Sequence, residues 1–99
     1  KKYDFIYATC GISPNDIPQT EEELWKNISE IKRIAIDDSK VVAIGEIGLD
    51  YYWEKDMQRR ELQQKAFIKQ IELANELQLP IVIHTREAVM DTLQILKEN

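Results

Sequence analysis

Three short apolar runs, spaced about 36 to 40 residues apart, constrain the fold of this chain more than any other feature of its sequence. They are Phe5–Thr9, Val41–Ile44 and Ile81–Ile83. Each run is continuous and does not alternate with polar residues, which is typical of strands buried on both faces of a parallel sheet. We therefore predict parallel strands that begin at residues 5, 41 and 81.

Helical patterns separate and follow these runs. Between the first two, apolar residues recur at spacings of four, three and four, which places them on one helix face: Leu24, Ile28, Ile31 and Ala35. Thr20–Glu23 before them is typical of a capping box. The second helix repeats the pattern at Phe67, Ile71, Ala74 and Leu77, and Pro80 ends it. The third begins near Glu87 and carries Val89, Leu93 and Leu96.

The predicted order is therefore βαβαβα, an α/β fold with right-handed crossovers. Two architectures use this unit, the open doubly wound sheet and the TIM-type (β/α)₈ barrel. No Gly-x-Gly-x-x-Gly follows a strand, which weakens the dinucleotide-binding version of the open sheet. A closed barrel needs about eight units, so in that architecture residues 1–99 form an incomplete barrel. Its outer strands would have open edges, and we expect them to favour self-association.

Net charge and cysteine content say less about function than the apolar runs say about the fold. The net charge is −5, whereas a protein that binds nucleic acid by charge alone is normally basic. An enzyme that handles phosphate through metal ions is an alternative, because its carboxylate ligands add negative charge. No run of about 18 apolar residues predicts a membrane span, and Lys1–Asp4 does not resemble a signal peptide. The single cysteine excludes an internal disulfide and fits a cytoplasmic location.

Glu46 and His84 are the strongest candidates for chemistry. Each directly follows a predicted strand, and sites in parallel α/β folds form at the carboxyl ends of strands. Neighbouring strands lie about 4.8 Å apart, so the two side chains could meet at one metal ion or as an ion pair. A carboxylate and an imidazole are both good ligands for zinc or manganese.

Residues next to this pair have two interpretations each. The aromatic side chains within Asp50–Trp53 could stack on nucleobases or simply pack the loop onto the barrel rim. Arg86 could bind a phosphate or pair with a carboxylate. We expect Glu87 and Asp91 to face solvent or to pair with Arg86. Cys10 has no base to activate it, so we predict a buried, unreactive thiol.

Three motifs stand out within residues 8–97: Ala43–Trp53, Ile83–Ala88 followed by Asp91 and Leu96, and the helix between them with Gln58, Gln64, Phe67 and Gln70. Taken together, they resemble the TatD family of metal-dependent deoxyribonucleases. It implies a (β/α)₈ barrel that hydrolyses DNA with Mg²⁺, Mn²⁺ or Zn²⁺, two ions in the complete enzyme. By position, Glu46 would be a catalytic carboxylate ligand shared by both ions, and His84 would bind one of them.

The sequence also departs from the family pattern. The family's His-x-His pair on the first strand is absent from residues 1–99, as are a further His and a late Asp. Where the family commonly has a Gly-Ile/Val-His-Pro-His loop, this chain reads Gly11–Asn15, with Ser13 and Asn15 in place of both histidines. Both can hydrogen-bond a phosphate oxygen but cannot carry a charge to it. They join Asp50 and Arg86 as candidate substrate-binding residues.

Three functional hypotheses follow. In the first, the chain is part of a deoxyribonuclease and is inactive by itself, because two ligands cannot hold a catalytic pair of ions. In the second, the barrel and metals are kept but the substrate is an amide or ester, as in amidohydrolase-type enzymes. In the third, the replaced histidines mark a non-catalytic paralogue.

Overall fold

A computed structural model describes residues 7–99. The elements are β1 (Ala8–Cys10), the 3₁₀ turn η1 (Pro14–Asp16), α1 (Glu21–Asp37), β2 (Val41–Asp50), α2 (Met57–Leu77), β3 (Ile81–Arg86) and α3 (Val89–Glu98). The predicted βαβαβα order is confirmed, with η1 as an addition. The predicted start of the first strand, at Phe5 and Ile6, lies outside the described residues.

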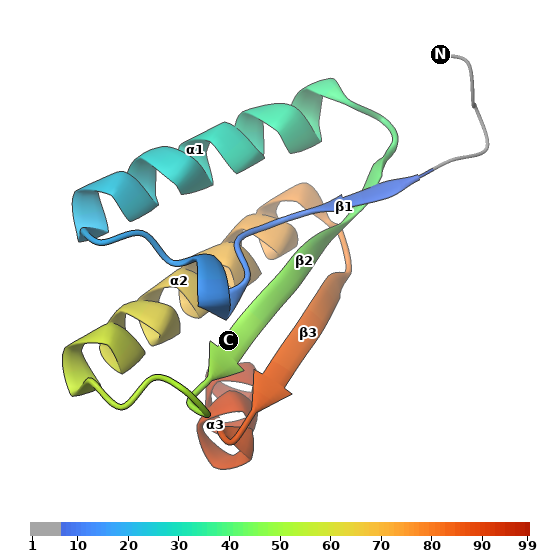
Figure 1. The fold of residues 1–99 in the computed structure, drawn as a ribbon. Helices are drawn as coiled ribbons and strands as arrows, with labels where there is room; N and C mark the ends of the chain where they lie inside the picture. The colour runs from blue at the N-terminus through green and yellow to red at the C-terminus, as the bar shows by residue number, and fades with distance from the viewer. Residues whose placement is uncertain (1–6) are drawn as a thin grey trace.

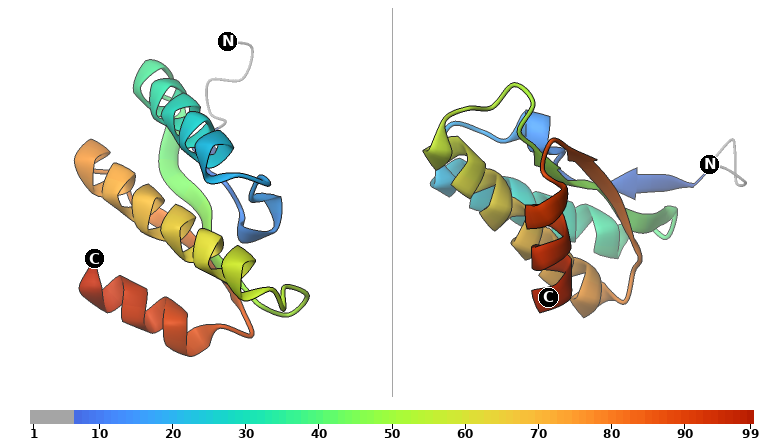
Figure 2. Two further views of the ribbon diagram at one scale, coloured as in Figure 1. Left: turned by 90° about the vertical axis from the view of Figure 1, so that its left-hand side faces the viewer. Right: turned by 90° about the horizontal axis from the view of Figure 1, so that it is seen from below.

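The three strands form one parallel sheet in the order β1-β2-β3. The helices gather on one side of this sheet, which leaves its other side without a covering layer (Figures 1 and 2). Since β2 is central, β1 and β3 each have one edge that no strand of residues 7–99 pairs with. A three-stranded sheet of this kind is a partial barrel wall, as predicted.

Side-chain caps explain where the first two helices begin. The Thr20 hydroxyl accepts a hydrogen bond from the Glu23 N–H at 3.1 Å, so the predicted N-cap of α1 is confirmed. α2 begins ten residues before Phe67, because the Asp56 carboxylate caps it by accepting from the Gln58 N–H at 2.9 Å. It ends at Leu77, followed by Gln78 in the left-handed region with φ 58°.

The core lies between β2 and the helices. Its fully buried side chains include Leu24 of α1, Phe67 of α2, and Ile44, Ile47 and Leu49 of β2. α2 packs along β2 and so fixes the position of the central strand. Removal of these apolar surfaces from water is the main force that holds the sheet to its helices.

The apolar runs predicted that every strand is buried on both faces. This prediction is wrong for β1 and β3. β2 is buried along most of its length, but Val82 and Ile83 of β3 are both more than a third exposed. The reason is that helices cover only one side of the sheet, and β3 also has an open edge.

The third helix also differs from its prediction. α3 packs through Ala88, Thr92 and Ile95, whereas Val89 and Leu93 are 55% and 57% exposed. Leu96, the third residue of the predicted face, is partly buried against the core. The helix is thus rotated from the predicted orientation: its buried face carries Thr92 and Ile95, and the Thr92 hydroxyl contacts the Thr85 hydroxyl of β3 at 2.9 Å.

No helix within residues 7–99 is both long enough and apolar enough to cross a membrane.

Candidate functional site

The candidate site begins with an irregularity in β2. The sequence predicted that Glu46 and His84 follow their strands. Instead β2 runs to Asp50 and β3 to Arg86, so both residues lie inside the strands. In the pairing of β2 with β3, Gly45 faces Val82 and Ile47 faces Ile83, which leaves Glu46 as an extra residue. Such a bulge re-aims a side chain. The side chain of Glu46 is 60% exposed, although its neighbours in β2 are buried.

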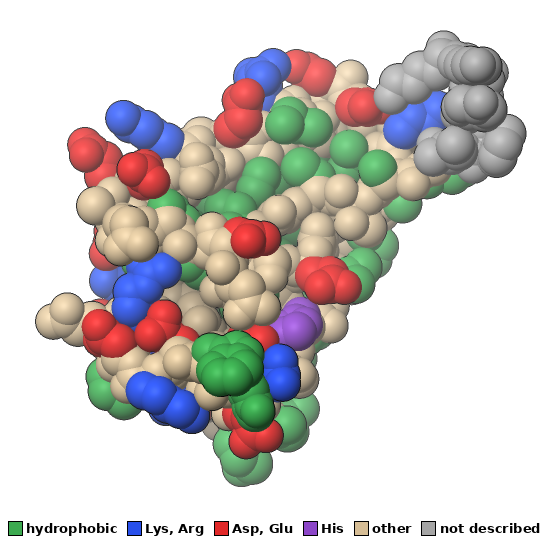
Figure 3. All heavy atoms as spheres, in the orientation of Figure 1, with side chains coloured by type: hydrophobic (Ala, Val, Ile, Leu, Met, Phe, Trp, Pro, Cys, Tyr) green, Lys and Arg blue, Asp and Glu red, His purple; other side chains and the backbone are tan. Residues whose placement is uncertain are grey.

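His84 lies between two carboxylates. Its Nδ1 is 4.0 Å from Glu46 Oε1, and its Nε2 is 3.0 Å from Asp50 Oδ2. Register explains the second contact: His84 pairs with Gly48 and Arg86 pairs with Asp50, so His84, Asp50 and Arg86 share the sheet face opposite the helices. The structure therefore brings together the two residues predicted as metal ligands. In Figure 3, the single histidine (purple) lies at the surface of this side of the molecule.

Asp50 is an almost completely buried carboxylate, with 2% of its surface exposed. Besides the contact with His84, its Oδ1 accepts from the Tyr52 N–H at 3.1 Å and its Oδ2 accepts from Asn15 Nδ2 at 3.3 Å. Burial by itself raises the pKa of this carboxyl, but the hydrogen bonds from His84, Tyr52 and Asn15 outweigh it, so the pKa lies below its ordinary value. Asp50 is thus held as an anion.

Two buried glutamines of α2 fix the backbone on which the site is built. Gln63 accepts from the Asp50 N–H at 2.9 Å and donates to the Asp50 carbonyl at 3.0 Å. Gln70 does the same for Ile12, at 2.7 and 3.2 Å. Neither stands out in the sequence as a site residue. The available signal is two amides seven residues apart, on the helix face that carries Phe67.

The structure separates the two residues that replace the family's loop histidines. Asn15 reaches the site through its bond to Asp50. The Ser13 hydroxyl instead caps η1, where it accepts from the Asn15 N–H at 3.3 Å. Substrate binding by either residue stays a prediction.

Arg86, Tyr52 and Trp53 form a surface group beside His84, here called the aromatic cluster. The Arg86 guanidinium lies 3.8 Å from the centre of the Tyr52 ring, and the Tyr52 and Trp53 rings meet edge to face at 4.5 Å. Trp53 is 76% exposed, so it does not pack the loop onto the sheet. Within residues 7–99 the Arg86 side chain makes no ion pair, which leaves its charge available to a ligand.

Two acidic residues follow Arg86, one before α3 and one in its first turn. Glu87 and Asp91 are exposed, as expected, and Asp91 accepts a hydrogen bond from the Tyr51 hydroxyl at 2.9 Å. Cys10 is the last residue of β1. It was predicted to be buried, but it is only half-buried. Burial raises the pKa of its thiol, in keeping with low reactivity.

The donor types of Glu46 and His84 suit a divalent metal ion. Two bonds of about 2.1 Å place their donor atoms about 3.4 Å apart in a tetrahedral site and at most about 4.2 Å apart, so the 4.0 Å pair needs only a small approach to hold one ion. Within residues 7–99 no group of three or more His, Cys, Asp or Glu side chains is placed to hold a metal. The described chain therefore offers two ligands of an incomplete set.

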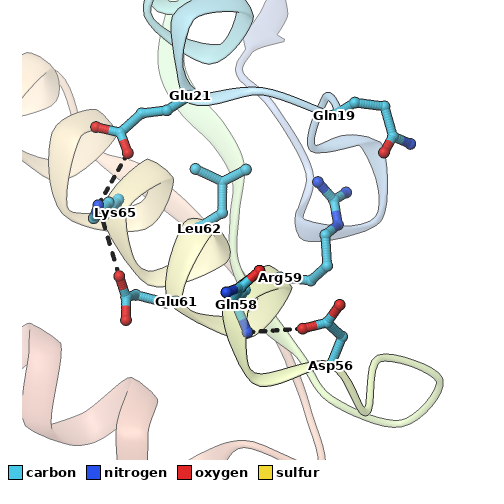
Figure 4. Close-up of a pocket in the computed structure, with 8 residues that line it drawn as sticks. All are labelled: Gln19, Glu21, Asp56, Gln58, Arg59, Glu61, Leu62 and Lys65. Atoms are coloured by element: carbon cyan, nitrogen blue, oxygen red, sulfur yellow. Dashed lines mark hydrogen bonds and ion pairs between the residues drawn. The ribbon is translucent and has the colours of Figure 1, made fainter.

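A separate pocket of about 330 Å³ lies between α1 and the start of α2 (Figure 4). It is lined by Gln19, Glu21, Asp56, Gln58, Arg59, Glu61, Leu62 and Lys65. The Lys65 ammonium bridges Glu21 at 2.9 Å and Glu61 at 3.7 Å, and Arg59 donates to the carbonyls of Ile17 and Pro18. These contacts tie α2 to α1 and to the loop that precedes α1. None of the lining residues belongs to the candidate site.

Comparisons with known proteins show what the chain is similar to. A family model described as TatD related DNase matches residues 1–99. The chain is 49% identical over 100 residues to a metal-dependent hydrolase of Bacillus subtilis, a match that covers 99% of this chain and 36% of that protein. It is 37% identical over 89 residues to the 3'-5' ssDNA/RNA exonuclease TatD of Salmonella typhimurium, covering 89% of this chain and 32% of that protein.

A solved structure supports the fold. The crystal structure of a TatD homologue from Escherichia coli K12 superimposes with a TM-score of 0.82 at 30% identity, covering 97% of this chain and 36% of that one. The chain thus spans about a third of the length of the relatives it matches.

Proposed function

The chain belongs to the TatD-related DNase family, and we propose that it supplies Glu46 and His84 to the metal site of a hydrolase that cleaves DNA phosphodiester bonds. The observation that carries the proposal is the meeting of these two side chains on neighbouring strands, with the remaining ring nitrogen of His84 held by Asp50. Histidine ligands of metals almost always donate their second ring N–H to a carboxylate, a backbone carbonyl or water.

Each residue has a separate part in this proposal. A bound divalent ion supplies Lewis-acid chemistry, polarising a phosphoryl oxygen and lowering the pKa of water. Glu46 would contribute a carboxylate oxygen from the exposed bulge, and His84 would contribute its Nδ1. Mg²⁺, Mn²⁺ and Zn²⁺ are the candidate ions, two in the complete enzyme, whose remaining ligands would come from outside residues 1–99.

Nucleic acid as the substrate is supported by the aromatic cluster. The exposed Trp53 ring offers a face on which an unpaired base can stack, and Arg86 offers a guanidinium suited to phosphate. Asn15 could donate a neutral hydrogen bond to the same ligand. The Salmonella typhimurium relative is named for action on single-stranded DNA and RNA. The free Cys10 is in keeping with a cytoplasmic location.

The proposal is tested with the protein that carries this chain together with the rest of the barrel. A single-stranded oligonucleotide, its duplex and a dihydropyrimidine-type amide are each incubated with Mn²⁺ or Mg²⁺. We expect cleavage of DNA and its loss with EDTA. We also expect a fall of at least about 100-fold in kcat/KM on Glu46→Gln, since losing even a hydrogen-bond partner of a metal ligand costs about 10- to 100-fold.

Glu22→Gln is the matched control, because it removes the same charge from an exposed position on α1. It should leave kcat/KM unchanged. DNA cleavage that survives Glu46→Gln would refute the site, and hydrolysis of the amide without DNA cleavage would favour an amidohydrolase-type activity. A protein that binds no divalent ion at pH 7 would be a non-catalytic paralogue.

A further inference from the structure

Asp50 presents no free carboxylate oxygen to a ligand. It is 2% exposed, its Oδ1 accepts from the Tyr52 N–H, and its Oδ2 accepts from Asn15 and contacts His84 Nε2 at 3.0 Å. A buried charge is costly unless it is fully hydrogen-bonded. These contacts explain how the carboxylate can be buried. They also leave neither of its oxygens open to accept a hydrogen bond from a ligand. Asp50 is therefore poorly placed to bind substrate itself.

The contact with His84 has a defined direction. An ionised carboxylate can only accept hydrogen bonds, so the His84 Nε2 must carry the proton that lies between them. In the neutral ring the proton is then absent from Nδ1, whose lone pair is free. Nδ1 is the nitrogen that faces Glu46 Oε1, at 4.0 Å. The ring thus turns its unprotonated edge toward the other candidate ligand.

The position of Asp50 is itself held from behind. Gln63, 3% exposed, binds both the N–H and the carbonyl of Asp50 with a single amide group. This clamp fixes the last residue of β2 against α2, and the Asp50 carboxylate projects from it toward β3. Within the described residues no buried side-chain polar atom lacks a partner, so the network is complete.

We propose that Asp50, anchored by Gln63, is a positioning residue that holds His84 in its Nε2-protonated tautomer and aims Nδ1 at the metal shared with Glu46. The identity of the metal as the ligand of His84 rests on the proposed function, whereas the protonation of the His84 ring does not. This positioning role replaces the earlier expectation that Asp50 binds substrate directly. Carboxylate partners of metal-binding histidines typically change metal affinity by about 10- to 100-fold.

The first test needs no substitution. His84 is the only histidine of the chain, so a long-range ¹H–¹⁵N spectrum of the untagged 99-residue protein contains one imidazole. Recorded near pH 8.5, about two units above the ordinary histidine pKa, it should show Nε2 protonated and Nδ1 unprotonated. A ring protonated mainly at Nδ1 would overturn the proposal.

The second test compares Asp50→Asn with Asp91→Asn. Both remove one charge and one hydrogen-bonded carboxylate, but Asp91 bonds the Tyr51 hydroxyl and does not contact His84. Calorimetric titration with Mn²⁺ alone should show about 10- to 100-fold weaker binding for Asp50→Asn, with mixed tautomers in its spectrum. Asp91→Asn should match the unsubstituted chain in both measurements. Equal Mn²⁺ affinity of the two folded variants would refute the positioning role.

The outcomes separate this inference from the proposed function. If DNA is not cleaved, but the His84 ring is Nε2-protonated and both this tautomer and Mn²⁺ affinity depend on Asp50, the inference stands and the nuclease assignment fails. If DNA is cleaved through Glu46 while the ring is protonated at Nδ1, the function stands and the positioning role fails.

Discussion

Replacing Gln63 with leucine should destabilise the chain strongly, because it removes the only amide that binds the backbone of Asp50 from α2. Leucine fills a similar volume, so the cavity term is small. The Asp50 N–H and carbonyl lose partners at 2.9 and 3.0 Å beneath a residue that is 2% exposed. A buried polar group left without a partner costs about 1–3 kcal/mol. Two such groups give a sum of about 2–6 kcal/mol, and relaxation at the strand end should reduce this to about 2–4 kcal/mol.

The measurement is urea unfolding followed by circular dichroism at pH 7, with Gln70→Leu as the matched control. Gln70 makes the same pair of bonds to Ile12 and is fully buried, so its loss in unfolding free energy should be similar. Only Gln63→Leu should also weaken Mn²⁺ binding, since Gln63 binds the backbone of Asp50 whereas Gln70 binds that of Ile12. A change below about 0.5 kcal/mol at unchanged m-value, the range of ordinary surface substitutions, would refute the reasoning.

Three further predictions concern the sheet and its first strand. Gly48→Ala should cost more than about 2 kcal/mol in the same urea assay, because Gly48 has φ 150° and a Cβ there would collide with the His84 carbonyl oxygen; an unchanged stability would contradict the close approach of β2 and β3. Iodoacetamide should alkylate Cys10 with a pH midpoint above the ordinary thiol value of about 8.5, because burial raises the pKa of this thiol and lowers the thiolate fraction at any given pH. A midpoint at or below that of the urea-unfolded chain would count against this. Sedimentation velocity should show concentration-dependent association through the open edges of β1 and β3, and a monomer at all concentrations would exclude it.

Much of the fold could be predicted from local signals in the sequence. Apolar runs and helix periodicity depend on residues close together in the chain, and so does the Thr20 cap. These features predict the order and type of the three strands and three α-helices, together with the end of α2 before Pro80. The proximity of Glu46 and His84 could also be predicted, because they follow apolar runs of neighbouring parallel strands, although both lie inside the strands and not at their ends.

Features that depend on tertiary contacts could not be predicted in the same way. The bulge at Glu46 arises from the register between β2 and β3, which no local pattern encodes. The orientation of α3 involves the contact of Thr92 with Thr85 of β3. Val89 is apolar, so its residue type does not predict that its side chain is exposed. The role of Gln63 follows only from its distance to the Asp50 backbone, because a glutamine on a helix is usually at the surface.

Paramagnetic broadening by Mn²⁺ would test most directly whether Glu46 and His84 form a metal site. A ¹⁵N-labelled sample of the 99-residue chain is titrated with substoichiometric Mn²⁺, and the loss of each NMR signal is followed. We predict that signals of residues 46 and 84 and their strand neighbours broaden first, and that Glu46→Gln removes this selective effect. Broadening centred on the acidic residues of the first turn of α1, Glu21–Glu23, or evenly spread over the chain, would contradict a metal site at these strands.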